Sequence, residues 1–456
     1  MSNSLKFGTS GLRGLATELV GPESRRYAAA FLRYLRSRGE VRRILVGRDL
    51  RASSPEIAAS VIAGLDCEVV DCGEVPTPAL ALEAMRQGAP AIMVTGSHIP
   101  ADRNGLKFYR ADGEIDKDDE VGILAALGDA PDHATIATPE PLAATRYLDR
   151  YRGMLGEKGL RDRRIGVWQH SSVARDLFVA ALEAAGATVA PLGRSASFVP
   201  VDTEAVAPDT AQQIAAWVRE HKLDALVSTD GDADRPLMAD ENGALVRGDV
   251  IGILTARFVG AASVVTPVTS NSSIEGTGYF RHVTRTRVGS PYVIAGMAGA
   301  EGPVLGFEAN GGVLLSSDVT LGGTTLTALP TRDALLPILA VLGAAEAQGG
   351  SLAALVATLP PRIARSDRLE HVPQERTALL MQQLRADAAG FLAPQGQIAS
   401  VSDIDGLRYE LTGGDVIHYR PSGNAPELRC YTEAASAERA DALLAWGLEA
   451  AAAIVR

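Results

Sequence analysis

Three carboxylates at alternating positions are the sharpest indication of chemistry in this sequence. Asp230, Asp232 and Asp234 follow residues 226–229, a short segment that predicts the end of a buried strand. Side chains two positions apart on an extended or looped backbone can converge on one side of it. Adjacent carboxylates repel one another unless a cation neutralises them, and their hard oxygens favour Mg²⁺ or Ca²⁺ over zinc. The run therefore predicts a divalent metal site that also expects a phosphate ligand, with a solvated acidic turn as the alternative.

A second polar loop places a serine next to a histidine. In residues 95–109, Ser97 and His98 are neighbours and Lys107 follows ten positions after Ser97. The apolar residues 89–94 predict a buried strand before this loop, and residues 106–109 predict that a strand restarts after it. A strand end that delivers Ser, His and Lys to one loop is a typical place for chemistry in an α/β protein. An ordinary turn is an equal alternative for this stretch alone.

Three more loops carry residue types that bind ligands. Residues 306–312 place Glu308 and Asn310 among glycines, and such a carboxylate and amide suit the hydroxyls of a polyol. Residues 7–14 present Arg13 between glycines. Residues 420–429 combine forked arginine donors, short polar donors and a glycine, which together predict an anion cradle. The cradle residues are Arg420, Ser422, Gly423, Asn424 and Arg429. Each loop has a structural alternative. Residues 306–312 could be a glycine-rich turn, residues 7–14 an N-terminal loop without a function, and residues 420–429 a hairpin with surface arginines.

Composition limits the class of protein. The chain has 456 residues, 46% of them hydrophobic and 22% charged, which is typical of a globular enzyme of about three domains. Its net charge is −11 and no block of Lys and Arg stands out, so we expect no nucleic-acid partner, and an anionic ligand must be held by local arginines. Three sparse cysteines argue against a disulfide framework and structural zinc. The first nine residues lack the apolar core of a signal peptide and no run of about 18 apolar residues occurs, so we expect a cytoplasmic protein without a membrane partner.

These loops must be positioned by several α/β units. A weak repeat of strand, polar loop, helix and strand begins near residues 42 and 163, and a third unit begins near residue 261. Alternating strands and helices predict an α/β fold, with three related domains that contain parallel or mixed sheets. Short alternating segments between two predicted helices, 374–389 and 437–455, predict a C-terminal α+β domain with its helices on one face of an antiparallel sheet. The predicted domains are residues 1–145 with the Ser97 loop, 146–248 with the Asp loop, 249–365 with the Glu308 loop and 366–456 with the arginine cradle.

In this order and spacing, the five loops resemble those of the α-D-phosphohexomutase superfamily, which includes phosphomannomutases and phosphoglucomutases. The resemblance spans all four predicted regions and implies that they are arranged around a central active-site cleft. It implies an isomerase that moves a phosphoryl group between O1 and O6 of a hexose through a phosphoserine enzyme. Ser97 is then the phosphorylated residue. Asp230, Asp232, Asp234 and a phosphoserine oxygen at Ser97 hold Mg²⁺.

The resemblance also implies roles for the other residues. Arg13 and Lys107 are placed near Ser97, and Lys107 is the candidate general acid and base, provided that burial and neighbouring cations lower its pKa. His98 either assists the reaction or donates a hydrogen bond. Arg235 contacts the ligand or the phosphoserine. Glu308 and Asn310 bind sugar hydroxyls, and the phosphate that is not transferred is held by the cradle residues Arg420, Ser422, Gly423, Asn424 and Arg429.

Two loops depart from the pattern of the superfamily. Residues 308–312 read Glu-Ala-Asn-Gly-Gly, where many members have Glu-x-Ser-Gly-His or a similar pattern, so the preferred sugar stays open. Residues 169–176 replace a glycine-rich loop, and His170 and Arg175 either reach the metal region or belong to a capped helix N-terminus. Residues 285–292 resemble another loop that faces the ligand.

The expected function is therefore that of a Mg²⁺-dependent phosphomannomutase of the bacterial type. It acts on small hexose phosphates with a hexose 1,6-bisphosphate as activator and intermediate, as a monomer or homodimer. The alternatives are a phosphoglucomutase or dual enzyme, then a phosphoglucosamine mutase. Outside this class, a non-catalytic sugar-phosphate-binding protein and a metal-dependent phosphatase remain.

Overall fold

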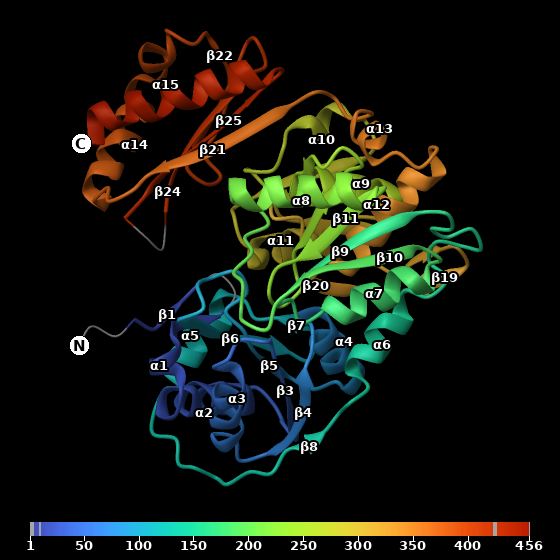
Figure 1. The fold of residues 1–456 in the computed structure, drawn as a ribbon. Coiled ribbons are helices and arrows are strands. Elements are labelled where there is room, and N and C mark those ends of the chain that lie inside the picture. Colours follow the sequence, from blue (N-terminus) through green and yellow to red (C-terminus); the bar gives the residue numbers. More distant parts are fainter. Residues whose placement is uncertain (1–3, 9–10, 423–425, 456) are drawn as a thin grey trace. The chain divides into compact units, whose positions relative to one another are not determined.

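The computed structural model describes residues 4–8, 11–422 and 426–455. The chain forms two compact units: unit 1 consists of Met1–Val265 and Gly289–Val356, and unit 2 consists of Thr266–Val288 and Ala357–Arg456. Unit 1 contains three α/β layers and unit 2 contains an antiparallel sheet with two long helices (Figure 1). No helix in the described ranges is long and apolar enough to cross a membrane.

The first sheet of unit 1 has the strand order β1-β2-β6-β5-β3-β4-β8, and β7 pairs with β6. Its centre is parallel, because β3 pairs in parallel with β4 and β5, whereas β6 is antiparallel to β5 and β2. Every residue of β5 is buried, as expected for a central strand that is covered on both faces. The strands are β1 (Lys6–Phe7), β2 (Leu12–Leu15), β3 (Arg43–Arg48), β4 (Glu68–Glu74), β5 (Ala91–Val94), β6 (Arg103–Arg110), β7 (Gly113–Glu114) and β8 (Thr138–Pro139). The helices are α1 (Ala16–Leu19), α2 (Pro22–Arg36), α3 (Ser54–Ala63), α4 (Thr77–Gln87) and α5 (Lys117–Ala125).

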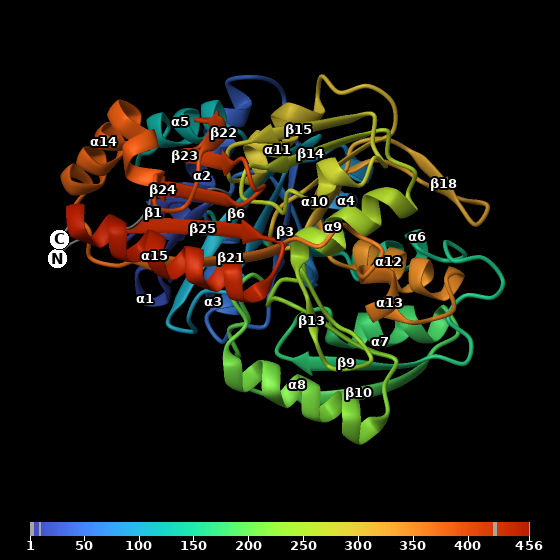
Figure 2. The same cartoon turned by 90° about the horizontal axis from the view of Figure 1, so that it is seen from above.

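The second sheet has the order β10-β9-β11-β12-β13. Its first three strands are parallel, and β11 then turns back into the antiparallel strand β12, so the connection between them is a hairpin loop. Helices α7 and α8 lie on opposite faces of this sheet (Figures 1 and 2). The elements are α6 (Ala143–Arg150), β9 (Arg164–His170), α7 (Arg175–Ala184), β10 (Thr188–Arg194), α8 (Pro208–His221), β11 (Ala225–Thr229), β12 (Pro236–Ala239) and β13 (Leu245–Val246).

In the third layer, β14 pairs in parallel with β16, and β16, β17 and β20 are consecutive antiparallel neighbours. The connection from β16 to β17 is again a hairpin loop. A small separate sheet is formed by β18 and β19. The elements are α9 (Gly248–Phe258), β14 (Ser263–Pro267), α11 (Ser290–Met297), β16 (Val304–Phe307), β17 (Val313–Leu315), β18 (Val319–Leu321), β19 (Thr324–Leu326), β20 (Leu329–Asp333), α12 (Leu335–Ala347) and α13 (Leu352–Val356).

Unit 2 is built on an antiparallel sheet with the order β21-β25-β24-β23-β22. Alternate residues of β23, namely Leu407, Tyr409 and Leu411, share one core with the long helices α14 and α15. The alternation is that of a sheet covered by helices on one face only. The elements are α10 (Ser273–Gly276), β15 (His282–Thr286), β21 (Ile363–Leu369), α14 (Gln374–Leu392), β22 (Ile398–Ser402), β23 (Leu407–Leu411), β24 (Val416–Pro421), β25 (Leu428–Ala434) and α15 (Ala437–Val455).

The predicted fold class of three α/β domains and a C-terminal α+β domain is confirmed. The helices predicted at 374–389 and 437–455 are α14 and α15. The strand expected to restart at residue 106 begins earlier, at Arg103, because residues 103–106 already pair with β2. The predicted domain boundaries remain predictions.

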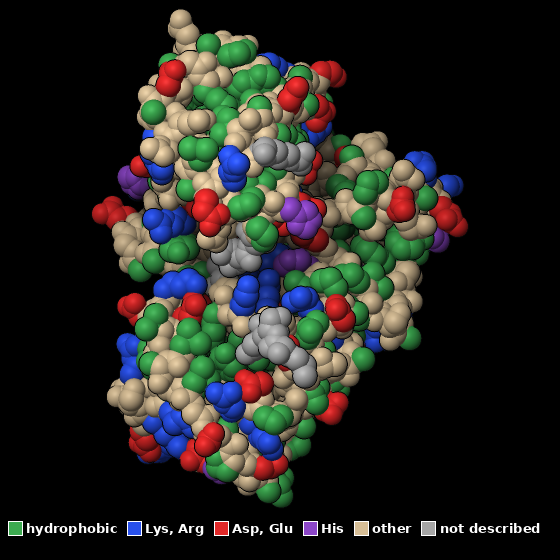
Figure 3. Space-filling view, turned by 90° about the vertical axis from the view of Figure 1, so that its left-hand side faces the viewer, with side chains coloured by type: hydrophobic (Ala, Val, Ile, Leu, Met, Phe, Trp, Pro, Cys, Tyr) green, Lys and Arg blue, Asp and Glu red, His purple; other side chains and the backbone are tan. Residues whose placement is uncertain are grey.

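Charges are mixed on the surface. Acidic and basic side chains are interspersed over the face that Figure 3 shows. Because the net charge is −11, the basic groups that hold an anion must be gathered locally.

Candidate active site

Ser97 lies in the loop that follows β5, and its backbone conformation is unusual. The residue is 1% exposed and has a φ of 52°, in the left-handed region that non-glycine residues rarely adopt. Its Oγ donates a hydrogen bond of 2.5 Å to Asp230 Oδ2, and its amide donates to Thr95 Oγ1 at 2.8 Å. Such backbone strain persists only where the surroundings fix it, and it is concentrated at functional sites.

Arg51, which the sequence reasoning missed, fixes this loop. Its buried guanidinium donates hydrogen bonds to four backbone carbonyls of the loop, at distances between 2.6 and 3.0 Å. Those carbonyls belong to Ser97, Ile99, Pro100 and Arg103. The guanidinium also pairs with buried Asp49 at 3.3 Å and lies 3.8 Å from the ring centre of Phe198. A Cβ at Gly96 would lie 2.6 Å from Arg51 Cζ, so only glycine fits there.

We expect Arg51→Lys to lower kcat by about 100-fold while KM changes little. Lysine keeps the charge beside Asp49, but its single ammonium cannot reach four carbonyls, and a misplacement of about 1 Å can cost a factor of this size. Initial rates with a hexose 1-phosphate measure the effect. Arg48→Lys is the control, because Arg48 is in the same strand region but its guanidinium pairs with Asp71 at 2.9 Å and, within the described residues, hydrogen-bonds no carbonyl of the loop. An Arg51→Lys enzyme with the kcat of the wild type would contradict the assigned role.

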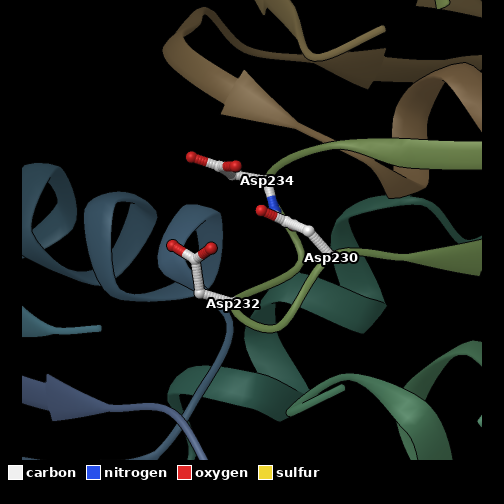
Figure 4. Close-up of side chains that lie close together, drawn as sticks. All are labelled: Asp230, Asp232 and Asp234. Atoms are coloured by element: carbon white, nitrogen blue, oxygen red, sulfur yellow. The ribbon is translucent and has the colours of Figure 1, made fainter. Parts of the chain in front are cut away.

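The hairpin loop between β11 and β12 brings the three aspartates together. Asp230, Asp232 and Asp234 are completely buried, and their carboxylates point to the same side of the loop (Figure 4). One oxygen of each lies within 4.8 Å of the others. Ala233, between two of them, has a φ of 59°, which helps the loop to turn. The predicted convergence of these side chains is therefore present.

The donor set fits a divalent cation. Asp232 Oδ1 and Asp234 Oδ1 are buried and have no hydrogen-bond partner in the described part of the chain. Burial, together with Asp232 and Asp234, raises the pKa of Asp230 well above its ordinary value. Three buried carboxylates, two of which have an unused oxygen, are hard ligands of the kind that Mg²⁺ prefers.

Lys107 reaches the same cluster. Its Nζ lies 2.6 Å from Asp232 Oδ2 and 2.6 Å from Asp234 Oδ2. Burial alone would lower the pKa of Lys107, but the two carboxylates outweigh it and the pKa is raised. The lowered pKa that we expected for Lys107 is therefore not met, because the prediction did not include these carboxylates, which lie more than 120 positions away. A lysine held in this way is a charged donor.

Arg332 connects the metal loop to the loop between β16 and β17. It donates from Nε to Asp234 Oδ2 at 3.0 Å and from Nη1 to Glu308 Oε2 at 2.9 Å. Near Glu308, Asn310 Oδ1 accepts a hydrogen bond from the Gly312 amide at 3.0 Å. Arg332 was not predicted, because it does not belong to a recognised motif. Its role follows from its contacts with Asp234 and Glu308.

His98 contacts both Ser97 and Arg235. Its Nδ1 lies 3.1 Å from Arg235 Nη1 and 3.2 Å from Ser97 Oγ. Because a guanidinium can only donate, Nδ1 must be an acceptor and the ring proton is on Nε2. Burial, followed by Arg235 and Arg13, lowers the pKa of His98 to about 2, so the ring is neutral. Of the two predicted roles, donation from Nδ1 to Ser97 is thus incompatible with this geometry.

Arg13, in β2, lies near the same cluster and is kept apart from carboxylate partners. Burial and the neighbouring Arg235 and Arg332 lower its pKa to about 10. Within the described residues its guanidinium makes no hydrogen bond or ion pair. A half-buried cation whose donors are not used by a carboxylate is a suitable donor for a phosphoryl group.

The arginine cradle belongs to unit 2. Arg420 and Arg429 are directly opposite each other on β24 and β25, and Arg420 Nε donates to Asp405 Oδ2 at 2.7 Å. The Ser422 amide donates to the Glu427 carbonyl at 3.0 Å. Gly423 and Asn424 lie outside the described residues. Arg429 Nη2 lies 3.6 Å from Glu427 Oε2, so each of the two arginines has a carboxylate neighbour.

His170 binds the backbone just before the metal loop, whereas Arg175 binds carbonyls outside that loop. His170 Nε2 donates to the carbonyl of Thr229, which precedes Asp230, at 2.9 Å. Arg175 Nη1 donates to the carbonyl of Ser195 at 3.0 Å. Both side chains thus bind backbone carbonyls, and within the described residues neither one hydrogen-bonds an Asp carboxylate of the metal loop.

Comparison with known proteins places every part of the chain in one group. Four family models match: phosphoglucomutase/phosphomannomutase, alpha/beta/alpha domain I at residues 4–131, domain II at 145–243, domain III at 247–363, and the C-terminal domain at 369–445. A phosphomannomutase from Sinorhizobium fredii is 50% identical over 470 residues and covers 97% of this chain and 98% of its own. A phosphomannomutase from Salmonella muenchen is 43% identical over 452 residues and covers 96% of this chain and 94% of its own. A crystal structure of a phosphoglucomutase/phosphomannomutase family protein from Burkholderia thailandensis has the same fold, with a TM-score of 0.78, 24% identity and coverage of 99% of this chain and 98% of that one.

Proposed function

Because the chain belongs to the phosphoglucomutase/phosphomannomutase family, we propose that it is a phosphomannomutase that interconverts mannose 6-phosphate and mannose 1-phosphate through a phosphoserine at Ser97. The observation that carries the proposal is the hydrogen bond of 2.5 Å between Ser97 Oγ and Asp230, at the edge of a buried cluster of three carboxylates. The choice of mannose rests on the two relatives that are 50% and 43% identical and carry that name.

Asp230, Asp232 and Asp234 would hold Mg²⁺, with an oxygen of the phosphorylated Ser97 completing the set. A cation held by these carboxylates would supply positive charge to the phosphoryl oxygens during the transfer. The unused oxygens of Asp232 and Asp234 support this assignment.

The cations around Ser97 would position the phosphoryl group. Lys107 and Arg13 donate to its oxygens, and Arg235 approaches it from the metal loop. Lys107, whose raised pKa keeps it protonated in the resting enzyme, would donate a proton to the departing serine oxygen and regain one from the attacking hydroxyl. His98 would hold Arg235 in place through its acceptor nitrogen.

Two loops would bind the sugar phosphate. Glu308 accepts hydrogen bonds from hydroxyls of the hexose, and the Asn310 amide can accept or donate them. The phosphate that is not transferred is bound by the cradle residues Arg420, Ser422, Gly423, Asn424 and Arg429. Arg420 and Arg429 are directly opposite each other, so their side chains lie on the same face of the sheet, where both can donate to one phosphate.

The reaction would run in two transfers. The phosphoserine gives its phosphoryl group to O1 of mannose 6-phosphate, which yields mannose 1,6-bisphosphate and a free Ser97 hydroxyl. The bisphosphate then turns over within the site, and its O6 phosphoryl group returns to Ser97. Both orientations must fit, which a cradle that recognises only phosphate permits.

Coupled assays with mannose, glucose and glucosamine 1-phosphates test the sugar. We expect kcat/KM to be highest for mannose 1-phosphate and at least about tenfold lower for glucosamine 1-phosphate, because an ammonium group alters the hydrogen bonds near Glu308. A comparable value for glucose 1-phosphate would make the enzyme dual. Turnover of the other two sugars without any turnover of mannose 1-phosphate would refute the assignment.

A further inference from the structure

Unit 2 contains a cavity that is unrelated to the predicted phosphate cradle. Its volume is about 430 Å³, within the range of pockets for small molecules, and it is bounded by α10, β15, β22 and β23. The wall holds three arginines and two glutamates: Arg285, Arg362, Arg408, Glu275 and Glu410. None of its residues belongs to the cradle at 420–429 or to the loops around Ser97.

One arginine–glutamate pair of the wall is part of the scaffold. Arg285 donates to both oxygens of Glu275 at 2.8 Å, and its Nη1 donates to the carbonyls of Pro267 and Ser270 at 3.1 and 2.7 Å. The bidentate pair and the carbonyl partners occupy the hydrogen-bond donors of Arg285, and the charge of Glu275 is neutralised by Arg285. These two side chains therefore shape the cavity and leave its binding chemistry to the other residues.

The groups that remain are mainly hydrogen-bond donors. In the described part of the chain, the Arg408 guanidinium makes no hydrogen bond and no ion pair. Ser273 is 3% exposed, and its Oγ has no hydrogen-bond partner among the residues that the structure describes. Arg362 uses Nη1 for the Gly414 carbonyl at 2.5 Å. A buried hydroxyl and a half-buried guanidinium without partners are costly unless a ligand satisfies them.

The charge of Arg408 is also incompletely balanced. Burial lowers its pKa, and Glu433, the strongest opposing group, offsets this only in part. Glu433 is itself occupied, because it accepts hydrogen bonds from the amide and hydroxyl of Ser272. Glu410 accepts a hydrogen bond from Ser400 at 3.2 Å and retains capacity for a ligand hydroxyl.

We propose that this cavity is a second anion site, which binds the phosphate group of free phosphate or of a small phosphate ester through Arg408, Arg362 and Ser273. Arginine forks match two phosphate oxygens and a serine hydroxyl matches a third. The site goes beyond the mutase reaction, since binding there requires neither Ser97 nor the metal loop.

Equilibrium dialysis of the full chain with labelled inorganic phosphate tests the proposal. We expect Arg408→Gln to bind one phosphate fewer per chain than the wild type. Arg420→Gln removes a different phosphate, so the double variant loses two. Arg365→Gln is the matched control, because Arg365 is a half-exposed arginine of unit 2 that pairs with Asp441 outside the cavity.

Ser273→Ala keeps the test decisive if Arg408→Gln folds poorly. It removes one oxygen, and we expect the affinity of the second site to fall about tenfold, as for a hydrogen bond to a charged group. Phosphate binding to both variants with the stoichiometry and affinity of the wild type would overturn the proposal. Competition between labelled phosphate and a hexose 6-phosphate separates the two sources, and the Ser97→Ala background prevents turnover of the ester. If the ester binds more tightly than phosphate, the cavity is a site for a phosphate ester. If the ester binds more weakly, it is a site for free phosphate.

Discussion

Replacement of Ser97 by alanine is expected to lower kcat by at least about four orders of magnitude, because the enzyme loses the group that carries the phosphoryl intermediate. No other hydroxyl in the described residues donates to Asp230 in the way that Ser97 does, at 2.5 Å. Initial rates with mannose 1-phosphate and catalytic amounts of hexose 1,6-bisphosphate measure the loss. The loop itself should remain ordered, since Arg51 holds it through backbone carbonyls.

Ser197→Ala is the matched control for this variant. Ser197 is exposed, and among the described residues its hydrogen bonds are with Ser195, so the Ser197→Ala variant should have the rates of the wild type. Circular dichroism shows whether both variants are folded. A Ser97→Ala enzyme that retains more than about one per cent of the activity would mean that another residue receives the phosphoryl group.

The second large effect is expected for Asp232→Asn. The amide keeps the shape of the side chain but removes one of three charges, and its Oδ1 is one of the two buried oxygens that lack a partner. We expect weaker Mg²⁺ binding and a kcat lower by about three orders of magnitude, since metal ions supply several kcal/mol of transition-state stabilisation in phosphoryl transfer. Calorimetric titration with Mg²⁺ and rates measured against Mg²⁺ concentration give both quantities.

Asp240→Asn provides the comparison. Asp240 is also buried and lies one strand away, but its Oδ1 accepts hydrogen bonds from the amides of Asn242 and Ala244, which asparagine can preserve. It should bind Mg²⁺ like the wild type. If Asp232→Asn binds Mg²⁺ equally well and keeps its activity, the carboxylates are not the metal site.

Much of the site could be predicted because its key residues cluster in short loops at strand ends. Asp230, Asp232 and Asp234 lie on one hairpin, so their spacing alone determines that they can converge. Ser97 and His98 are likewise neighbours in sequence. The fold class followed from the alternation of strands and helices, which local patterns record well.

The remaining features depend on contacts between distant segments. Arg51 donates hydrogen bonds to backbone carbonyls of a loop about 50 positions away. Because every residue has a backbone carbonyl, the sequence does not indicate which carbonyls Arg51 binds. Arg332 gains its meaning only from Asp234 and Glu308, which lie 98 and 24 positions away. The raised pKa of Lys107 has the same origin, because it depends on carboxylates from another sheet. The roles of such residues can be recognised only in the folded structure, where segments that are distant in sequence are in contact.

Intact-mass measurement after incubation with glucose 1,6-bisphosphate and Mg²⁺ tests the central claim most directly. A mutase of this type should gain one phosphoryl group per chain, located on Ser97 by peptide mapping and absent from Ser97→Ala, without steady release of inorganic phosphate. A protein that releases inorganic phosphate and never carries the added group would instead be a phosphatase, and the phosphoserine account would be wrong.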